Sequence, residues 1–106
     1  DLSAHLSTHI SPELVRSADL VLGIARQHVR ESVVLDFSSF PYTFTLKEIV
    51  RRGREIGPQR SEESLADWLR AMSEGRRPVD HLGSSPDDDV ADPIGQRFAV
   101  YQRTAD

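Results

Sequence analysis

The chain has 106 residues, which suffices for one domain and is too short for two. Its 13 basic and 17 acidic residues give a net charge of -4, whereas a general nucleic-acid or membrane-surface coat would need the opposite sign. It contains no cysteine, which excludes disulfides, thiolate metal sites and cysteine nucleophiles among these residues. No apolar run approaches the ~20 residues of a membrane span, and no signal-peptide layout is present, so we expect a cytoplasmic protein.

The first predicted elements are a short helix and a buried strand. Ser11 can cap a helix whose first position is Pro12, and Glu13 favours its positive end. Residues 18–24 form a largely aliphatic run of strand length, as expected of a buried parallel strand.

A second helix is predicted over residues 25–36, with Val29, Val33 and Val34 facing inward. After a loop at residues 38–41, the β-propensity of residues 42–45 predicts a short strand.

A third helix is predicted to begin at a capping box formed by Thr45 and Glu48 and to end before Gly57. Its expected apolar stripe is Leu46, Ile49, Val50 and Ile56. Off this stripe lies a basic cluster that we expect to be a solvated face, made of Lys47, Arg51, Arg52 and Arg54.

The second half is predicted to be helix, loop and helix. Ser61 is expected to cap a helix that Gly75 closes. Its stripe is the clearest amphipathic pattern in the chain: Leu65, Trp68, Leu69 and Met72. Residues 76–95 are rich in Pro, Gly, Ser and Asp and predict a loop, and a last helix is expected over about 96–104.

Strands that alternate with helices indicate an α/β fold with a parallel sheet. The two predicted strands, near residues 19–24 and 42–45, are too few for a sheet covered on both faces. We therefore expect residues 1–106 to be a single, incomplete domain whose missing part lies N-terminal.

The acidic stretch at residues 87–93 is the most informative part of the chain. Counted from Asp87, a calcium loop would need an oxygen ligand at position 5, Gly at 6 and Glu at 12, but Ala91, Asp92 and Phe98 stand there. Asp92 differs from its acidic neighbours because Pro93 restricts its backbone and fixes the direction of its carboxylate. Nearby negative charges would raise its pKa, which suits a general acid.

The remaining residue patterns give little indication of function. His5 and His9 are four apart but lack an HExxH pattern and a third ligand, so no metal or other cofactor is expected. His28 follows a strand and is expected to make a structural hydrogen bond. The chain has no GxxxxGK[ST], GxGxxG or GxSxG motif.

Four stretches in order resemble the low-molecular-weight protein-tyrosine phosphatases. They cover nearly the whole chain: HLSTHISPEL at 5–14, ADLVLGIARQH at 18–28, TFTLKE at 43–48, and DVADPIG at 89–95 with the Phe98 and Tyr101 that follow. Thr8 and Ile24 depart from the basic residue and the methionine usual in the family.

The resemblance implies a three-layer αβα fold with a four-stranded parallel sheet, of which this chain would supply about two strands. It also implies a phosphoric monoester hydrolase that acts through a cysteinyl phosphate, with phosphotyrosine proteins as the leading substrates. Asp92 would be the general acid and base, and Pro93 would position its loop. Ile94 would line the substrate cleft, where the family usually has Phe or Tyr. The family's C-x5-R loop, which holds the nucleophile, is not among these residues, so the chain alone is expected to be inactive.

Three alternatives stay open. The chain could be a non-catalytic binding module derived from the phosphatase fold, an arsenate reductase of similar fold, or a phosphatase specific for phosphoarginine. The expected partner is a phosphorylated protein or a small phosphomonoester, with no nucleic acid and no membrane. An exposed sheet edge could also support self-association.

Overall fold

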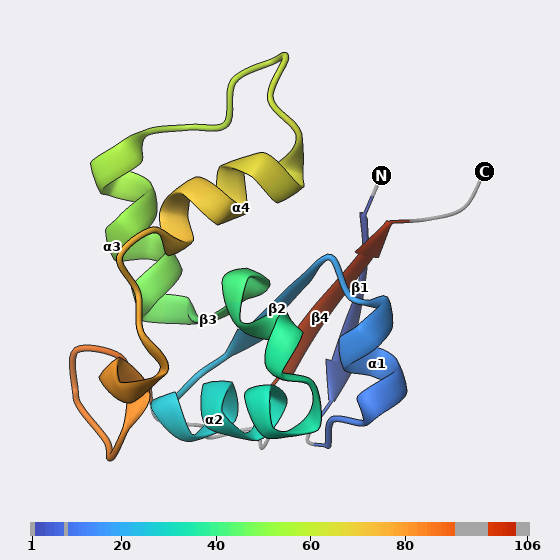
Figure 1. Ribbon diagram of the computed structural model, residues 1–106, viewed down its shortest axis with the longest axis vertical. Helices are drawn as coiled ribbons and strands as arrows, with labels where there is room; N and C mark the ends of the chain where they lie inside the picture. The colour runs from blue at the N-terminus through green and yellow to red at the C-terminus, as the bar shows by residue number, and fades with distance from the viewer. Residues whose placement is uncertain (1, 8, 91–97, 104–106) are drawn as a thin grey trace.

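The computed structural model describes residues 2–7, 9–90 and 98–103 and shows an α/β fold with a mixed sheet (Figure 1). The strands of this part of the chain are β1 (Leu2–Ser7), β2 (Leu20–Gly23), β3 (Thr43–Thr45) and β4 (Phe98–Arg103). They lie in the order β1-β4-β2-β3. The neighbours β2 and β3 pair in parallel, while β4 pairs antiparallel with both β1 and β2, so β4 runs against the direction of the other three strands.

The described helices begin close to the residues at which capping signals predict them. They are α1 (Pro12–Ser17), α2 (Arg26–Leu35), α3 (Leu46–Ile56) and α4 (Leu65–Ser73), with the 3-10 turns η1 (Phe37–Tyr42) and η2 (Pro78–His81). The Oγ of Ser11 accepts the Leu14 N–H at 3.1 Å, which confirms the first cap. The predicted capping box of α3 is also confirmed, since Thr45 and Glu48 each accept the other's backbone N–H.

The core lies on both faces of the β2–β3 pair. Val21 packs on one face with Ala18, Phe98 and Val100. The other face packs against α4 through a cluster made of Leu20, Leu22, Phe44, Leu69 and Met72. This confirms the predicted strand at 18–24 and the stripe of the amphipathic helix, and each fully buried aliphatic side chain contributes about 1.5–3 kcal/mol.

The expectation of two strands in a parallel sheet does not hold for the described residues, which form four strands in a mixed sheet. The polar first segment forms β1. The predicted final helix is instead β4, which lies between β1 and β2. The side chains of Phe98 and Val100 alternate with the half-buried Ala99, which is a strand period, and Val100 stands opposite Val21. So short an apolar pattern fits helix and strand alike, and long-range pairing decides between them.

Two predicted apolar faces are also corrected. Val34 is 85% exposed instead of facing inward, because only one side of α2 meets the sheet. On α3, Leu46, Val50 and Ile56 are each 44% exposed, and of the predicted stripe only Ile49 joins the core cluster.

The predicted cap of the fourth helix is displaced by three residues. The N-cap of α4 is Ser64, whose Oγ accepts the Asp67 N–H, and not Ser61. The helix ends at Ser73 and is followed by Gly75 at φ +82°, as its predicted closing role requires. No helix in the described part of the chain is both long enough and apolar enough to cross a bilayer.

Candidate functional site

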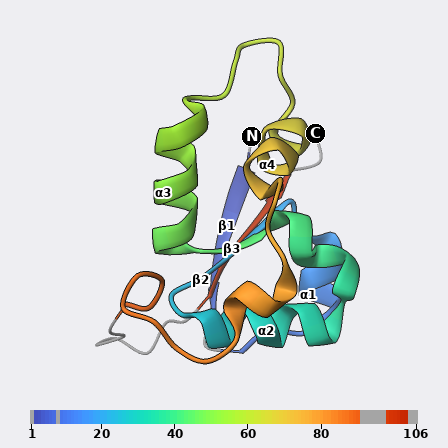
Figure 2. The ribbon, with the colours of Figure 1, turned by 60° about the vertical axis from the view of Figure 1, so that its left-hand side comes forward.

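The segment at residues 82–90 lies at the edge of the sheet where β2 and β3 end. Figure 2 shows it beneath the N-terminal end of α3 and beside the start of α2. The side chain of Asp88 is only 4% exposed and binds the Nε of Arg26 at 2.6 Å and the Nη2 of Arg51 at 3.1 Å. This hydrogen bond from Arg26 to Asp88 raises the pKa of the Arg26 guanidinium. One carboxylate therefore joins the segment to both helices.

Asp89 and Val90 fix the segment to the turn between β2 and α2. One carboxylate oxygen of Asp89 accepts the Arg26 N–H at 2.9 Å, and the other accepts the Ser85 N–H at 2.8 Å. The Val90 N–H donates to the carbonyl oxygen of Ile24 at 2.7 Å. The chain is thus held at the carboxyl end of β2 by backbone and side-chain contacts together.

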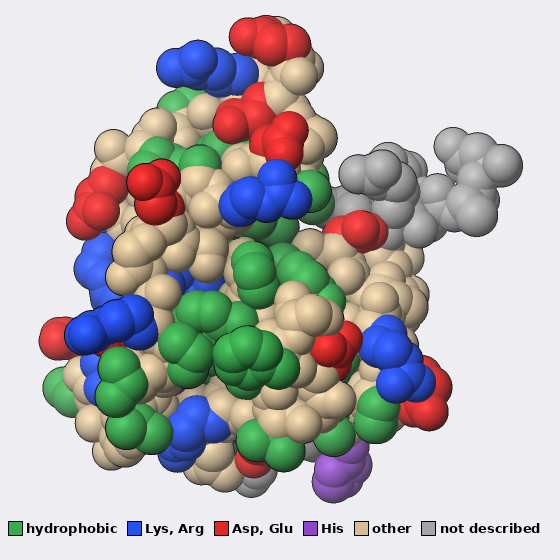
Figure 3. All heavy atoms as spheres, in the orientation of Figure 1, with side chains coloured by type: hydrophobic (Ala, Val, Ile, Leu, Met, Phe, Trp, Pro, Cys, Tyr) green, Lys and Arg blue, Asp and Glu red, His purple; other side chains and the backbone are tan. Residues whose placement is uncertain are grey.

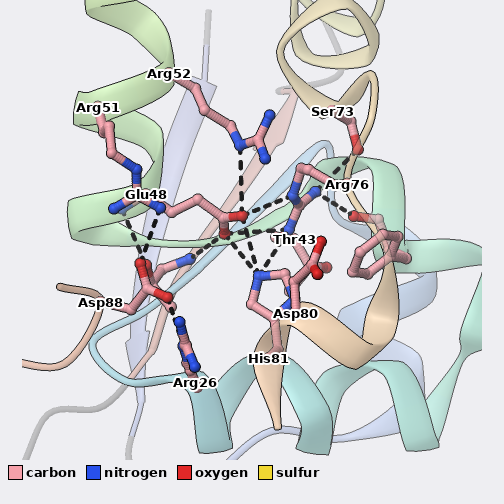
Figure 4. A network of polar contacts seen from close by, with 12 residues as sticks. Arg26, Thr43, Glu48, Arg51, Arg52, Ser73, Arg76, Asp80, His81 and Asp88 are labelled. Atoms are coloured by element: carbon pink, nitrogen blue, oxygen red, sulfur yellow. Dashed lines mark hydrogen bonds and ion pairs between the residues drawn. The ribbon is translucent and has the colours of Figure 1, made fainter. Parts of the chain in front are cut away.

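A buried network of Glu48, Arg76 and His81 joins α3 to the segment that follows α4 (Figure 4). Arg76 donates to Glu48 from Nε at 2.8 Å and from Nη2 at 3.2 Å. The Nε2 of His81 lies 3.0 Å from both carboxylate oxygens of Glu48. Burial raises the pKa of Glu48, but the hydrogen bond from His81 and the charge of Arg76 outweigh it and hold that pKa at about 2. Glu48 is therefore ionised at neutral pH.

Arg76 is the centre of this network. Its guanidinium also donates to the carbonyl oxygens of Phe40 and Thr43, and it lies over the rings of Phe40 and Phe44 at 4.4 and 4.1 Å. Burial lowers the pKa of Arg76, and the charge of Glu48 opposes that shift. The side chain of Arg76 is 0% exposed, so these contacts hold it in the interior of the domain.

An open groove of about 900 Å³ runs between α3 and the segment at 82–90. Its lining residues are Arg26, Leu46, Lys47, Val50, Arg51, Arg54, Asp87 and Val90. In Figure 3, Lys and Arg side chains recur on the left-hand side of the molecule, where α3 and this segment lie. A groove with aliphatic walls and several cations suits an anionic ligand that also carries apolar groups.

The three residues predicted to carry the chemistry, Asp92, Pro93 and Ile94, lie outside the described residues. The structural hydrogen bond predicted for His28 is confirmed: its Nδ1 accepts the N–H groups of Ile24 and Ala25. No group of three or more His, Asp or Glu side chains in the described ranges could hold a metal ion.

The basic cluster of α3 is more than a solvated face. Arg51 pairs with Asp88, and Lys47 donates to the carbonyl oxygen of Pro86 at 2.8 Å. Arg52 turns towards the core, with its Nε 3.6 Å from Glu48. The helix therefore uses these cations to hold the neighbouring segments.

Sequence reasoning missed Glu48, Arg76, His81 and Asp88 as site-building residues. Hydropathy assigns such side chains to the surface, so it gives no sign that they pair in the interior. The available signal was the capping box with Thr45, which places Glu48 in the first turn of α3, directly after the strand β3.

Comparison with known proteins identifies no relative. Neither the family models, nor the curated proteins, nor the solved structures give a significant match to this chain.

Proposed function

We propose that this chain provides the general acid and part of the substrate groove of a cytoplasmic phosphoric monoester hydrolase similar to the low-molecular-weight protein-tyrosine phosphatases. Asp92 is the acid, Pro93 positions it, and Ile94 lines the cleft. Phosphotyrosine in a protein is the leading substrate, and no metal or cofactor takes part.

The observation that supports this proposal is the attachment of Val90 to Ile24. It brings the chain, two positions before Asp92, to the carboxyl end of β2. Ligands of open α/β sheets bind outside the carboxyl ends of parallel strands, which is where an acid must act on a bound ester. The cations of the neighbouring groove fit a phosphate-bearing substrate.

The proposed reaction has two steps. A cysteine thiolate attacks phosphorus, the bond from phosphorus to the ester oxygen breaks, and Asp92 protonates the departing oxygen. Asp92 then takes a proton from water as the water oxygen attacks phosphorus, which releases inorganic phosphate and the thiolate. Because these 106 residues contain no cysteine, the nucleophile must come from residues outside them.

The proposal has a consequence for the fold. An all-parallel, three-layer αβα arrangement needs a parallel strand in the place of β4, because β4 runs antiparallel to both of its neighbours, β1 and β2.

A binding module is the second candidate, and the sheet itself favours it. β1 and β4 complete a four-stranded sheet without any phosphate-binding strand, and the exposed side chains of β1, from Ser3 to Leu6, lie on an edge strand that can pair with a partner.

Hydrolysis by the protein made from the natural reading frame around these residues separates the two candidates. We expect it to hydrolyse a phosphotyrosine peptide and to yield an acid-trapped cysteinyl phosphate, while the 106 residues alone release no phosphate. Turnover by the 106 residues alone would contradict the cysteine mechanism. Binding of a partner without any hydrolysis by the longer protein would favour the binding module.

A further inference from the structure

The helix α3 carries an apolar row and a cationic row side by side along the groove. Leu46 and Val50 are four residues apart and 44% exposed, which is unusual for side chains next to a core helix face. The cationic row begins one residue after Leu46 and also has helical spacing: Lys47, Arg51 and Arg54. The two rows therefore offer apolar contact and positive charge to one ligand.

The opposite wall is the segment at residues 82–90, which contributes Val90 to the apolar part of the groove and Asp87 to its rim. At about 900 Å³ the groove is large enough for several side chains of a peptide.

The charge of the groove is opposite to that of the whole chain. Among the described residues, four cations line it against the carboxylate of Asp87, and counting Asp88 and Asp89 behind it leaves an excess of one positive charge. Among the described residues, Lys47 donates to the carbonyl oxygen of Pro86, and that contact does not neutralise its charge. Arg54 is exposed at the far end of the row. The chain as a whole carries -4.

We propose that this groove docks an acidic peptide segment of a partner protein. The aliphatic side chains of the peptide contact Leu46, Val50 and Val90, and its carboxylates pair with Lys47 and Arg54. The inference deepens the proposed function and rests on it in one respect: docking here would present a protein substrate beside the segment that leads to Asp92. Docking itself needs no turnover and can be measured without it.

The composition of the groove favours a peptide over a nucleic acid. The described residues that line it include no aromatic side chain on which a base could stack. The negative charge of the rest of the chain would repel a long polyanion, whereas a short acidic segment meets only the local positive field.

Fluorescence anisotropy with unphosphorylated peptides tests the docking. The probe is a fluorescein-labelled peptide in which glutamates flank a Leu-Val pair, and the protein is that of the natural reading frame. We expect the affinity to fall as salt is added. Arg54→Glu should weaken binding by about fivefold, because it replaces an attraction by a repulsion. Val50→Ser should weaken it by about threefold through lost apolar contact.

Arg16→Glu is the matched control, because it makes the same change of charge on the exposed surface of α1, away from the groove. It should leave the affinity unchanged. Equal binding of a peptide with lysines in place of the glutamates, equal affinity of Arg54→Glu and the unmodified protein, or a preference for a single-stranded oligonucleotide would each overturn the proposal. Because the probe carries no phosphate, a failure to hydrolyse esters leaves this result intact.

Discussion

Replacing Glu48 by Gln tests whether the buried network holds the fold together. The variant keeps the shape of the side chain but leaves the guanidinium of Arg76 in the core without its counter-charge. Breaking such a buried pair typically costs about 3–5 kcal/mol. The pKa gives a similar magnitude: a fall from 4.5 to about 2 corresponds to about 3 kcal/mol in favour of the folded, ionised form. A domain of this size is stable by about 5–15 kcal/mol, so the loss should be large.

Urea unfolding at neutral pH measures this loss. The signal is the fluorescence of Trp68, which is partly buried and donates to the Gly57 carbonyl oxygen in the folded state. Glu55→Gln, an exposed change on the same helix, is the control and should stay within about 0.5 kcal/mol of the unmodified protein. Combining Glu48→Gln with Arg76→Met should cost clearly less than the sum of the two single changes. A loss below about 1 kcal/mol for Glu48→Gln, or strict additivity in the double variant, would refute the reasoning.

Three further predictions concern acid stability, packing and capping. The folded pKa of Glu48 is about 2 and its ordinary value is 4.5, so the stability that this carboxylate contributes is complete above pH 4.5 and is lost as the pH falls towards 2. Across this range the free energy of unfolding should fall by about 3 kcal/mol more in the unmodified protein than in Glu48→Gln. Parallel curves for the two proteins would contradict this. Gly23→Ala should destabilise the fold by about 1–3 kcal/mol in thermal melts, because an added Cβ would collide with the Cβ of His28, and an unchanged melting temperature would contradict this. Thr45→Ala should lower the free energy of unfolding in urea by about 1 kcal/mol, because it removes the hydroxyl that accepts the Glu48 N–H at the N-terminus of α3. An unchanged free energy would contradict the role of this hydroxyl as the N-cap.

Local chemistry in the sequence predicts the parallel half of the fold. The caps at Ser11 and Thr45 and the aliphatic run that contains β2 specify their elements through neighbouring residues alone. The pairing of β1 with β4 joins residues almost a whole chain apart, such as Ala4 and Tyr101, and neither segment has a distinctive period of its own. That pairing depends on the rest of the fold, so the sequence of neither segment predicts it.

The same limit applies to the charged residues of the candidate site, because the sequence alone does not predict which of them are buried. The loop composition of residues 76–95 gives no sign that Asp88 is buried. The structure buries it between Arg26 and Arg51, which lie 25 residues apart on two different helices. Glu48 and Arg76 are likewise 28 residues apart and pair only because α3 and the end of α4 meet. Burial of a charge depends on its partner, and the partner is fixed by tertiary structure.

The dependence of turnover on the leaving group tests the role of Asp92 most directly. In the protein of the natural reading frame, Asp92→Asn should slow hydrolysis of phenyl phosphate by about 10²-fold or more, and hydrolysis of p-nitrophenyl phosphate much less, because p-nitrophenolate departs without a proton. Asp67→Asn, an exposed change on α4, should leave both rates unaltered. Equal slowing of the two esters by Asp92→Asn, or no slowing of either, would contradict the assignment of this carboxyl group as the acid.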